Sequence, residues 1–198
     1  MLWKGKTVVL GVTGGIAAYK AATITSMLRQ AGAEVHVVMT EHATRFVTPL
    51  TFQTLSQNRV VADMFEPTAD WEIEHVALAD RADLVLIAPA TANIIGKIAA
   101  GIADDSLSAL VMSTRAPVVI APAMNVHMYE NPIVQANLRK LEELGYIFVE
   151  PDTGPLACGY EGKGRLAEPE EILRQAEQVL VRHQKPRPRA RRGTPRRK

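Results

Sequence analysis

Residues 7–18 read TVVLGVTGGIAA, and this stretch decides the fold. The short apolar run Thr7–Thr13, rich in β-branched residues, predicts a buried strand, and Gly14-Gly15 predicts a tight turn at its end. The Ala- and Leu-rich segment Ile16–Ala31 then predicts a helix that a glycine terminates. A buried strand that passes through a glycine turn into a helix is the opening unit of an α/β fold.

The same alternation of strand and helix continues along the chain. The expected strands are Glu34–Met39, Leu84–Ala88, Pro117–Ala121 and Tyr146–Val149, and the expected helices are Pro49–Gln57, Ala92–Ala100, Asp104–Thr114, Asn131–Leu144 and Glu168–Arg182. Alternating strands and helices predict βαβ units. We therefore expect an α/β protein with a three-layer, Rossmann-like or flavodoxin-like fold, in which helices cover both faces of a mostly parallel sheet.

Size and composition favour a single domain. The 198 residues are 47% hydrophobic but only 5% aromatic, as expected for parallel strands buried under helices. No apolar run approaches the ~18 residues of a membrane span, and the first residues lack a secretory apolar region. The single cysteine cannot form an internal disulfide, in agreement with a reducing compartment. We expect a cytoplasmic protein with no membrane partner.

Charge is distributed unevenly along the chain. The net charge of +2 comes from 23 basic and 21 acidic residues, but eight of the basic ones lie in Lys185–Lys198, which has no acidic residue. The remainder, with 15 basic and 21 acidic residues, carries a net charge of −6. We expect a folded domain over 1–183 and a disordered Pro/Arg-rich tail over 184–198. A nucleic-acid or anionic-surface arm is the alternative for the tail, but we expect no nucleic-acid partner.

The glycine turn is a candidate phosphate site. In doubly wound folds the ligand lies at the carboxyl ends of the strands, and a helix N-terminus after a glycine turn offers N–H groups to a phosphate. The turn around Gly14 and Gly15 is neither G-x-G-x-x-G nor a Walker A loop. Glu41 would suit the ribose of a dinucleotide, whereas Thr40 at the next strand tip suits a second phosphate or hydroxyl contact. A mononucleotide such as FMN fits better, and a turn without a ligand is the alternative.

Polar residues also follow the third and fourth expected strands. Thr91 and Asn93 suit a ribityl chain or a ring edge, although both would also serve as ordinary helix caps. Met124-Asn125 is unlike linker composition, and an Asn amide can bind a carboxylate without titrating.

The remaining candidates are two histidines and the cysteine. His75 falls in a short helix before the third strand, where a structural role is the usual one. His127 is expected to be a surface residue. Cys158 lies in Pro155–Leu166, which we interpret as a glycine-hinged loop able to close over a substrate; a small buried thiol is the alternative.

Two motifs carry a resemblance to a known family. Pro122–Met128 followed by Tyr129 has the form P-x-M-N-x-x-M plus an aromatic, and Leu156–Gly159 reads L-A-C-G. With the glycine turn, these segments resemble the flavin-containing cysteine decarboxylases over about Val8–Ala176. The chain departs from that pattern at Tyr129, where Trp is usual. Gly15 and Thr91 both stand where Ser is usual.

The resemblance implies an FMN-dependent carboxy-lyase of coenzyme A biosynthesis that converts 4′-phosphopantothenoylcysteine to 4′-phosphopantetheine. Oxidation of the cysteine side chain to a thioaldehyde allows CO2 to leave, because the C=S group accepts the electron pair of the broken bond and becomes an enethiolate. The enethiolate is then reduced. The implied roles are His75 as the base, Asn125 as the carboxylate ligand and Cys158 as the proton donor.

The resemblance also implies the residues around the ligands. Those expected at the cofactor are Gly14, Gly15, Ile16, Thr40, Thr91, Ala92, Asn93, Ile94 and Ala123, and those at the substrate are Asn125, Met128 and Ala157, with no metal ligand. The family implies a homotrimer or a homododecamer with FMN at subunit contacts, and a fused or separate CTP-dependent phosphopantothenate-cysteine ligase as partner. The alternatives are a flavin prenyltransferase, a peptide cysteine decarboxylase, a non-catalytic FMN-binding regulatory subunit and an NAD-dependent oxidoreductase.

Overall fold

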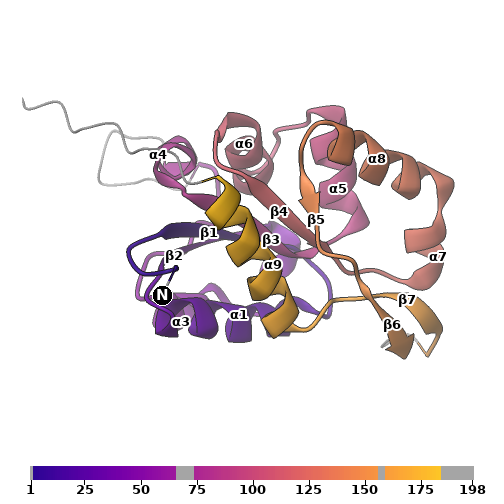
Figure 1. Ribbon diagram of the computed structural model, residues 1–198, viewed down its shortest axis with the longest axis horizontal. Helices are drawn as coiled ribbons and strands as arrows, with labels where there is room; N and C mark the ends of the chain where they lie inside the picture. The colour runs from indigo at the N-terminus through magenta and orange to yellow at the C-terminus, as the bar shows by residue number, and fades with distance from the viewer. Residues whose placement is uncertain (1, 66–73, 156–158, 184–198) are drawn as a thin grey trace, which may run out of the picture.

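A five-stranded parallel sheet forms the centre of the molecule (Figure 1). The computed structural model describes residues 2–65, 74–155 and 159–183. The strands are β1 (Thr7–Val12), β2 (Glu34–Met39), β3 (Leu84–Ala90), β4 (Val118–Pro122) and β5 (Ile147–Phe148). Their order, β2-β1-β3-β4-β5, is the flavodoxin-like order of doubly wound folds. The predicted α/β fold class is confirmed.

Helices cover both faces of this sheet. They are α1 (Ala18–Gln30), α2 (Glu41–Thr44), α3 (Pro49–Ser56), α4 (Glu74–Arg81), α5 (Ala92–Ala100), α6 (Ser106–Ser113), α7 (Val126–Glu130), α8 (Pro132–Glu143) and α9 (Pro169–Arg182). Buried side chains of α1, α3 and α9 pack on one face, and those of α4, α5, α6 and α8 pack on the other. The longer helices lie where the sequence predicts them, with ends that differ by one or two residues. In the part of the chain that the structure describes, no helix is both long and apolar enough to cross a bilayer.

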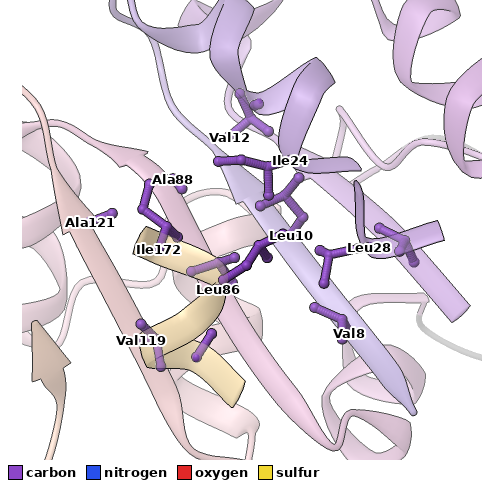
Figure 2. Packing of buried hydrophobic residues seen from close by; sticks show 14 of the residues in the cluster. Val8, Leu10, Val12, Ile24, Leu28, Leu86, Ala88, Val119, Ala121 and Ile172 are labelled. Atoms are coloured by element: carbon purple, nitrogen blue, oxygen red, sulfur yellow. The ribbon is translucent and has the colours of Figure 1, made fainter. Parts of the chain in front are cut away.

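The strands alternate their side chains between two cores. Val8, Leu10 and Val12 of β1 point toward Ile24 and Leu28 of α1 (Figure 2). Val9, between them in the chain, belongs to the cluster on the opposite face. Each buried aliphatic side chain of this kind contributes about 1.5–3 kcal/mol relative to an exposed one. Because both faces are covered, the strand reads as a continuous apolar run rather than as an alternation.

Gly11 shows how closely the layers approach. A Cβ placed on this residue of β1 would lie 2.5 Å from Cδ1 of Leu107, which is fully buried on α6. A Cβ at this position would have to displace the Leu107 side chain, so the glycine within the apolar run TVVLGV serves close packing rather than a turn.

A second, two-stranded antiparallel sheet departs from the sequence prediction. Strand β6 (Asp152–Pro155) pairs with β7 (Glu161–Arg165), so the interpretation of Pro155–Leu166 as a glycine-hinged loop is wrong for the residues that form β7. The composition EGKGR has neither the β-branched residues nor the alternation that identify a strand. Backbone pairing and tertiary contacts, rather than local preference, define this hairpin.

Candidate active site

A cavity of about 560 Å³ opens at the carboxyl ends of the parallel strands. All the residues expected at the cofactor line this one cavity, and so do Asn125 and Met128 from the substrate set. They come from the segments that follow β1, β2, β3 and β4. This position is the crevice where doubly wound folds bind their ligands.

The glycine turn forms one wall of the cavity. A Cβ on Gly14 would lie 2.3 Å from Cβ of His42, so the turn packs directly against α2. A Cβ on Gly15 would meet only the Thr91 methyl group, at 3.7 Å, an ordinary van der Waals contact. Beyond the turn, α1 begins at Ala18 with its N-terminus at the cavity. There is therefore space for a Cβ at Gly15, beside the cavity. At Gly14 a Cβ would clash with α2, so close packing favours glycine there.

Thr13 is a site residue that the sequence analysis did not select. Its side chain is 1% exposed, and its hydroxyl donates to the carbonyl of Pro89 at 2.7 Å. The same oxygen accepts from the backbone N–H of Thr91 at 3.0 Å. Thr13 therefore joins the end of β1 to the start of α5, two walls of the cavity. A buried hydroxyl at the end of an apolar strand is the signal that would have identified it.

Thr91 and Asn125 both cap helices at the cavity. The Thr91 hydroxyl accepts from the N–H of Ile94 at the start of α5, at 3.5 Å, as the capping alternative predicted. Asn125 lies in the short segment between the end of β4 at Pro122 and α7, where it is the N-cap, and its side-chain oxygen accepts from the N–H of His127 at 2.8 Å. This bond fixes which end of the Asn125 amide is the acceptor, and it sets the position of the amide nitrogen.

The hairpin is attached to the Met124-Asn125 segment through the backbone. The N–H of Met124 donates to the carbonyl of Gly164 in β7 at 2.9 Å, and the N–H of Ala123 donates to Ala90 at 2.9 Å. A Cβ on Gly164 would lie 2.4 Å from the carbonyl oxygen of Met124. The segment after β4 is therefore held on both sides, by β3 and by β7.

Tyr129 adds a side-chain contact between α7 and the hairpin. Its hydroxyl donates to Glu150 Oε2 at 3.4 Å, and the ammonium group of Lys163 lies 5.5 Å from the centre of its ring. Lys163 also forms an ion pair with Glu150. Burial and the nearby Glu150 carboxylate raise the pKa of Tyr129 above its ordinary value. Tyrosine at this position is thus buried and has polar partners.

Two cationic side chains line the cavity, Lys20 from α1 and Arg165 from β7. The ammonium of Lys20 lies 3.0 Å from Glu168 Oε2, and Nη2 of Arg165 lies 2.5 Å from Glu168 Oε1. The hydrogen bond from Lys20 lowers the pKa of Glu168, with a smaller contribution from Arg165.

Within the described residues, no cluster of three or more His, Cys, Asp or Glu side chains is arranged to hold a metal ion.

The other proposed catalytic residues are not brought together with Asn125 by the described part of the chain. Cys158 and Ala157 lie outside the described residues, although Pro155, just before them, lines the cavity. His75 is the second residue of α4, and its side chain is not described. Figure 1 places α4 at the opposite end of the sheet from α7, and no described residue of α4 lines the cavity.

His127 is exposed, in agreement with the interpretation of a surface histidine. Its ring packs edge-on against Tyr160, with 5.0 Å between the ring centres. It does not line the cavity, so it is not a candidate catalyst on the described geometry.

The fold and the cavity define the class of protein. A flavodoxin-like sheet with a ligand cavity at the carboxyl ends of its strands, a glycine turn and an adjacent helix N-terminus is the architecture of mononucleotide-binding α/β proteins. The family described as Flavoprotein matches residues 3–180, and the chain belongs to this family.

Similar proteins point in the same direction. The chain is 57% identical over 172 residues to the coenzyme A biosynthesis bifunctional protein CoaBC of Bacillus subtilis, which covers 87% of this chain and 42% of the relative. It is 47% identical over 173 residues to the protein of that name from Haemophilus influenzae, covering 87% of this chain and 43% of the relative. The chain thus spans about two fifths of the length of these curated relatives.

Two solved structures share the fold over nearly their whole length. The FMN-dependent cysteine decarboxylase SpaF matches with a TM-score of 0.78 and 32% identity, covering 92% of this chain and 98% of that one. A PPC decarboxylase mutant complexed with pantothenoylaminoethenethiol matches with a TM-score of 0.79 and 29% identity, covering 90% of this chain and 100% of that one.

Proposed function

We propose that this chain is an FMN-dependent carboxy-lyase that converts 4′-phosphopantothenoylcysteine to 4′-phosphopantetheine in coenzyme A biosynthesis. The observation that carries the proposal is the meeting of the glycine turn, the segment after β3 and the Met124-Asn125 segment around one cavity. Relatives that are named for coenzyme A biosynthesis or for PPC decarboxylation support the substrate.

The cavity fits a flavin mononucleotide. The turn at Gly14 and Gly15, followed by the N-terminus of α1, would hold the phosphate through backbone N–H groups and the positive end of the helix dipole. Thr40 and Thr91–Ile94 would border the ribityl chain and the ring edge. When bound, FMN supplies the capacity to accept a hydride from the substrate and to return it. Apolar residues at the cavity, among them Ala123, would exclude water from that exchange.

The chain's own residues would position the substrate and move its protons. Asn125 would hold the substrate carboxylate with its amide nitrogen, because a carboxylate accepts hydrogen bonds and the amide nitrogen is the donor end of the side chain. Met128, which lines the cavity, would pack against the acyl chain, together with Ala157. His75 would remove a proton during oxidation, and Cys158 would return one during reduction. A neutral thiol is required for that last role, so a site that strongly stabilised the thiolate would conflict with it.

The rim of the cavity supports assembly with further copies of the chain. Ile16, Tyr19 and Met128 line the cavity and yet are 60%, 60% and 48% exposed. A second copy that covers this rim would bury them, and it would also provide a His75 from outside the chain that holds the cavity. We propose a homotrimer, or a homododecamer built from trimers. A CTP-dependent phosphopantothenate-cysteine ligase, fused or separate, is the proposed partner, because the curated relatives are bifunctional and more than twice as long.

The test is turnover by the purified, yellow protein. Incubation with 4′-phosphopantothenoylcysteine should release CO2 and form 4′-phosphopantetheine, whereas Asn125→Ala should lower turnover at least a hundredfold without loss of bound flavin. Asn125→Asp is the informative second variant, because it keeps the helix cap but places a negative charge against the substrate carboxylate. A peptide ending in cysteine serves as the competing substrate. Flavin binding without CO2 release from either substrate would overturn the proposal and favour a regulatory flavoprotein.

A further inference from the structure

The charged residues of the cavity are all of one sign. Among the described residues that line it, Lys20 and Arg165 are the ones with permanent charge, and none is Asp or Glu. They come from distant parts of the chain, α1 and β7. A single carboxylate, Glu168 at the N-cap of α9, contacts both of them from outside the lining. Two cations that share one anion leave a net charge of about +1 at this wall.

The two cations are held in place before any ligand binds. The Lys20 side chain is only 13% exposed, although lysine is among the residues that are least often buried. It lies in the first turn of α1, close after Ile16 in the chain, and both residues line the cavity. Arg165 is the last residue of β7, and its guanidinium passes over the backbone of β6, 3.8 Å from where a Cβ on Gly154 would be. The Glu168 contacts orient both groups; the buried Lys20 needs little further ordering on binding, whereas the Arg165 side chain is 42% exposed.

We infer that Lys20 and Arg165 form a recognition pair for the phosphate ester of the substrate, and that they set the preference for a phosphorylated over an unphosphorylated acyl-cysteine. The inference rests on the proposed function and adds the specificity residues to it. Arg165 follows Gly164, whose carbonyl accepts from Met124, so Arg165 lies on the hairpin side of the cavity, while Lys20 reaches the same cavity from α1. A substrate with a carboxylate at one end and a phosphate at the other would be bound at both ends.

The chemistry of the pair suits a phosphate monoester. The planar Arg guanidinium has five donors in a fork that matches phosphate oxygens, and only one of its nitrogens contacts Glu168. The Lys ammonium adds a compact charge with three donors. The flavin phosphate is the competing source of the same chemistry. The glycine turn and the N-terminus of α1 already provide a site for that phosphate, which leaves the Lys20–Arg165 pair for the substrate.

A purely structural role is the other explanation, because the pair also ties α1 to α9 through Glu168. The two explanations predict different measurements. A structural tie would change stability and affect all substrates alike. A recognition pair would change the ratio of kcat/KM for the phosphorylated substrate to kcat/KM for pantothenoylcysteine, which lacks the phosphate. The complex of a related decarboxylase with pantothenoylaminoethenethiol indicates that unphosphorylated ligands can enter such a cavity.

The experiment compares the flavin-loaded wild-type enzyme with five variants. Lys20→Met and Arg165→Met remove the cavity charges, while Lys4→Met and Arg174→Met remove the same charges from exposed positions outside the cavity. Each cavity variant should lower the specificity ratio at least tenfold, and Arg165→Lys should restore part of it. The control variants should keep the ratio within twofold. In the wild type, the ratio should fall as ionic strength rises.

Three outcomes would overturn the inference. The first is an unchanged ratio in both cavity variants, with turnover of both substrates still present. The second is loss of FMN, but not of riboflavin, from Lys20→Met with an unchanged ratio, which would assign the pair to the flavin phosphate. The third is a wild-type enzyme that turns over neither substrate, in which case the proposed function itself fails, and the specificity assignment with it.

Discussion

Replacement of Gly164 by alanine should detach the β6–β7 hairpin from the wall of the site. The added Cβ would lie 2.4 Å from the carbonyl oxygen of Met124, a backbone atom that cannot rotate away as a side chain does. Gly164 also has φ +149°, a conformation that residues with a Cβ rarely adopt. The substitution therefore opposes both the position and the conformation of the β7 backbone.

The magnitude follows from these two effects. Backbone strain of this kind costs about 1–3 kcal/mol. Separation of the strands would also lose the hydrogen bond from Met124 to Gly164, worth about 0.5–1.5 kcal/mol. We expect a loss of about 2–4 kcal/mol, a large part of the 5–15 kcal/mol that stabilises a typical domain. If docking of the hairpin contributes less than this, the hairpin detaches and the remaining domain stays folded.

Urea unfolding followed by circular dichroism, together with the flavin absorbance of the purified protein, measures both consequences. Gly154→Ala is the matched control in the same hairpin, because its Cβ would meet only Arg165 Nη1, at an ordinary 3.8 Å. We expect Gly164→Ala to unfold at lower urea, or to unfold like the wild type but lose flavin. Equal stability and equal flavin content in the two variants would refute the reasoning.

Two further predictions concern buried polar contacts. Thr13→Val should lower the free energy of unfolding in urea by about 2–4 kcal/mol, because it leaves the Pro89 carbonyl and the Thr91 N–H without their partner. Thr13→Ser keeps the hydroxyl and should retain most of the wild-type stability. Equal stability of the two variants would contradict this explanation. Burial alone would raise the pKa of Asp105, but hydrogen bonds from Lys97 and Ser108 bring it below its ordinary value. The ionised Asp105 carboxylate therefore stabilises the folded state. This stabilisation is fully present above the unfolded-state pKa of about 3.9, and it is lost as the pH falls through the lower folded-state pKa. Asp105→Asn, which keeps a capping side chain, should therefore be on the order of 1 kcal/mol less stable at neutral pH, with the difference closing below about pH 4 in urea unfolding; a constant difference would show that charge is not its cause.

The strands and most helices could be predicted because the pattern of apolar residues and of helix-terminating residues along the chain identifies them. A parallel strand covered on both faces must be apolar throughout, and Thr7–Val12 and Leu84–Ala90 show this in sequence. The same alternation predicts parallel strands, but it does not distinguish the observed order β2-β1-β3-β4-β5 from the other doubly wound order. The cavity position could be predicted too, because the carboxyl ends of parallel strands meet at one edge.

The parts that could not be predicted depend on contacts between distant residues or on very short elements. Helices α2 and α7 have four and five residues, too few for a periodic pattern. Strand β7 is defined by its pairing with β6 and by the docking of Gly164 on Met124. Lys20 and Glu168 are separated by 148 positions in the chain, so their ion pair leaves no local signal.

The hairpin makes the two sides of the cavity depend on each other. A two-stranded sheet is at best marginally stable alone, and β7 contains no large apolar side chain with which to pack. The contacts that hold it against the rest of the domain include the backbone bond between Met124 and Gly164, the Tyr129–Glu150–Lys163 cluster, and the ion pairs of Glu168. Two of these contacts involve residues that line the cavity, Met124 and Arg165. A ligand that touches both therefore stabilises the docked hairpin by mass action, since only the docked form presents both residues. The glycines of β7 let the strand lie close enough to Met124 for this coupling, which is why a segment with little strand preference is well placed beside the site.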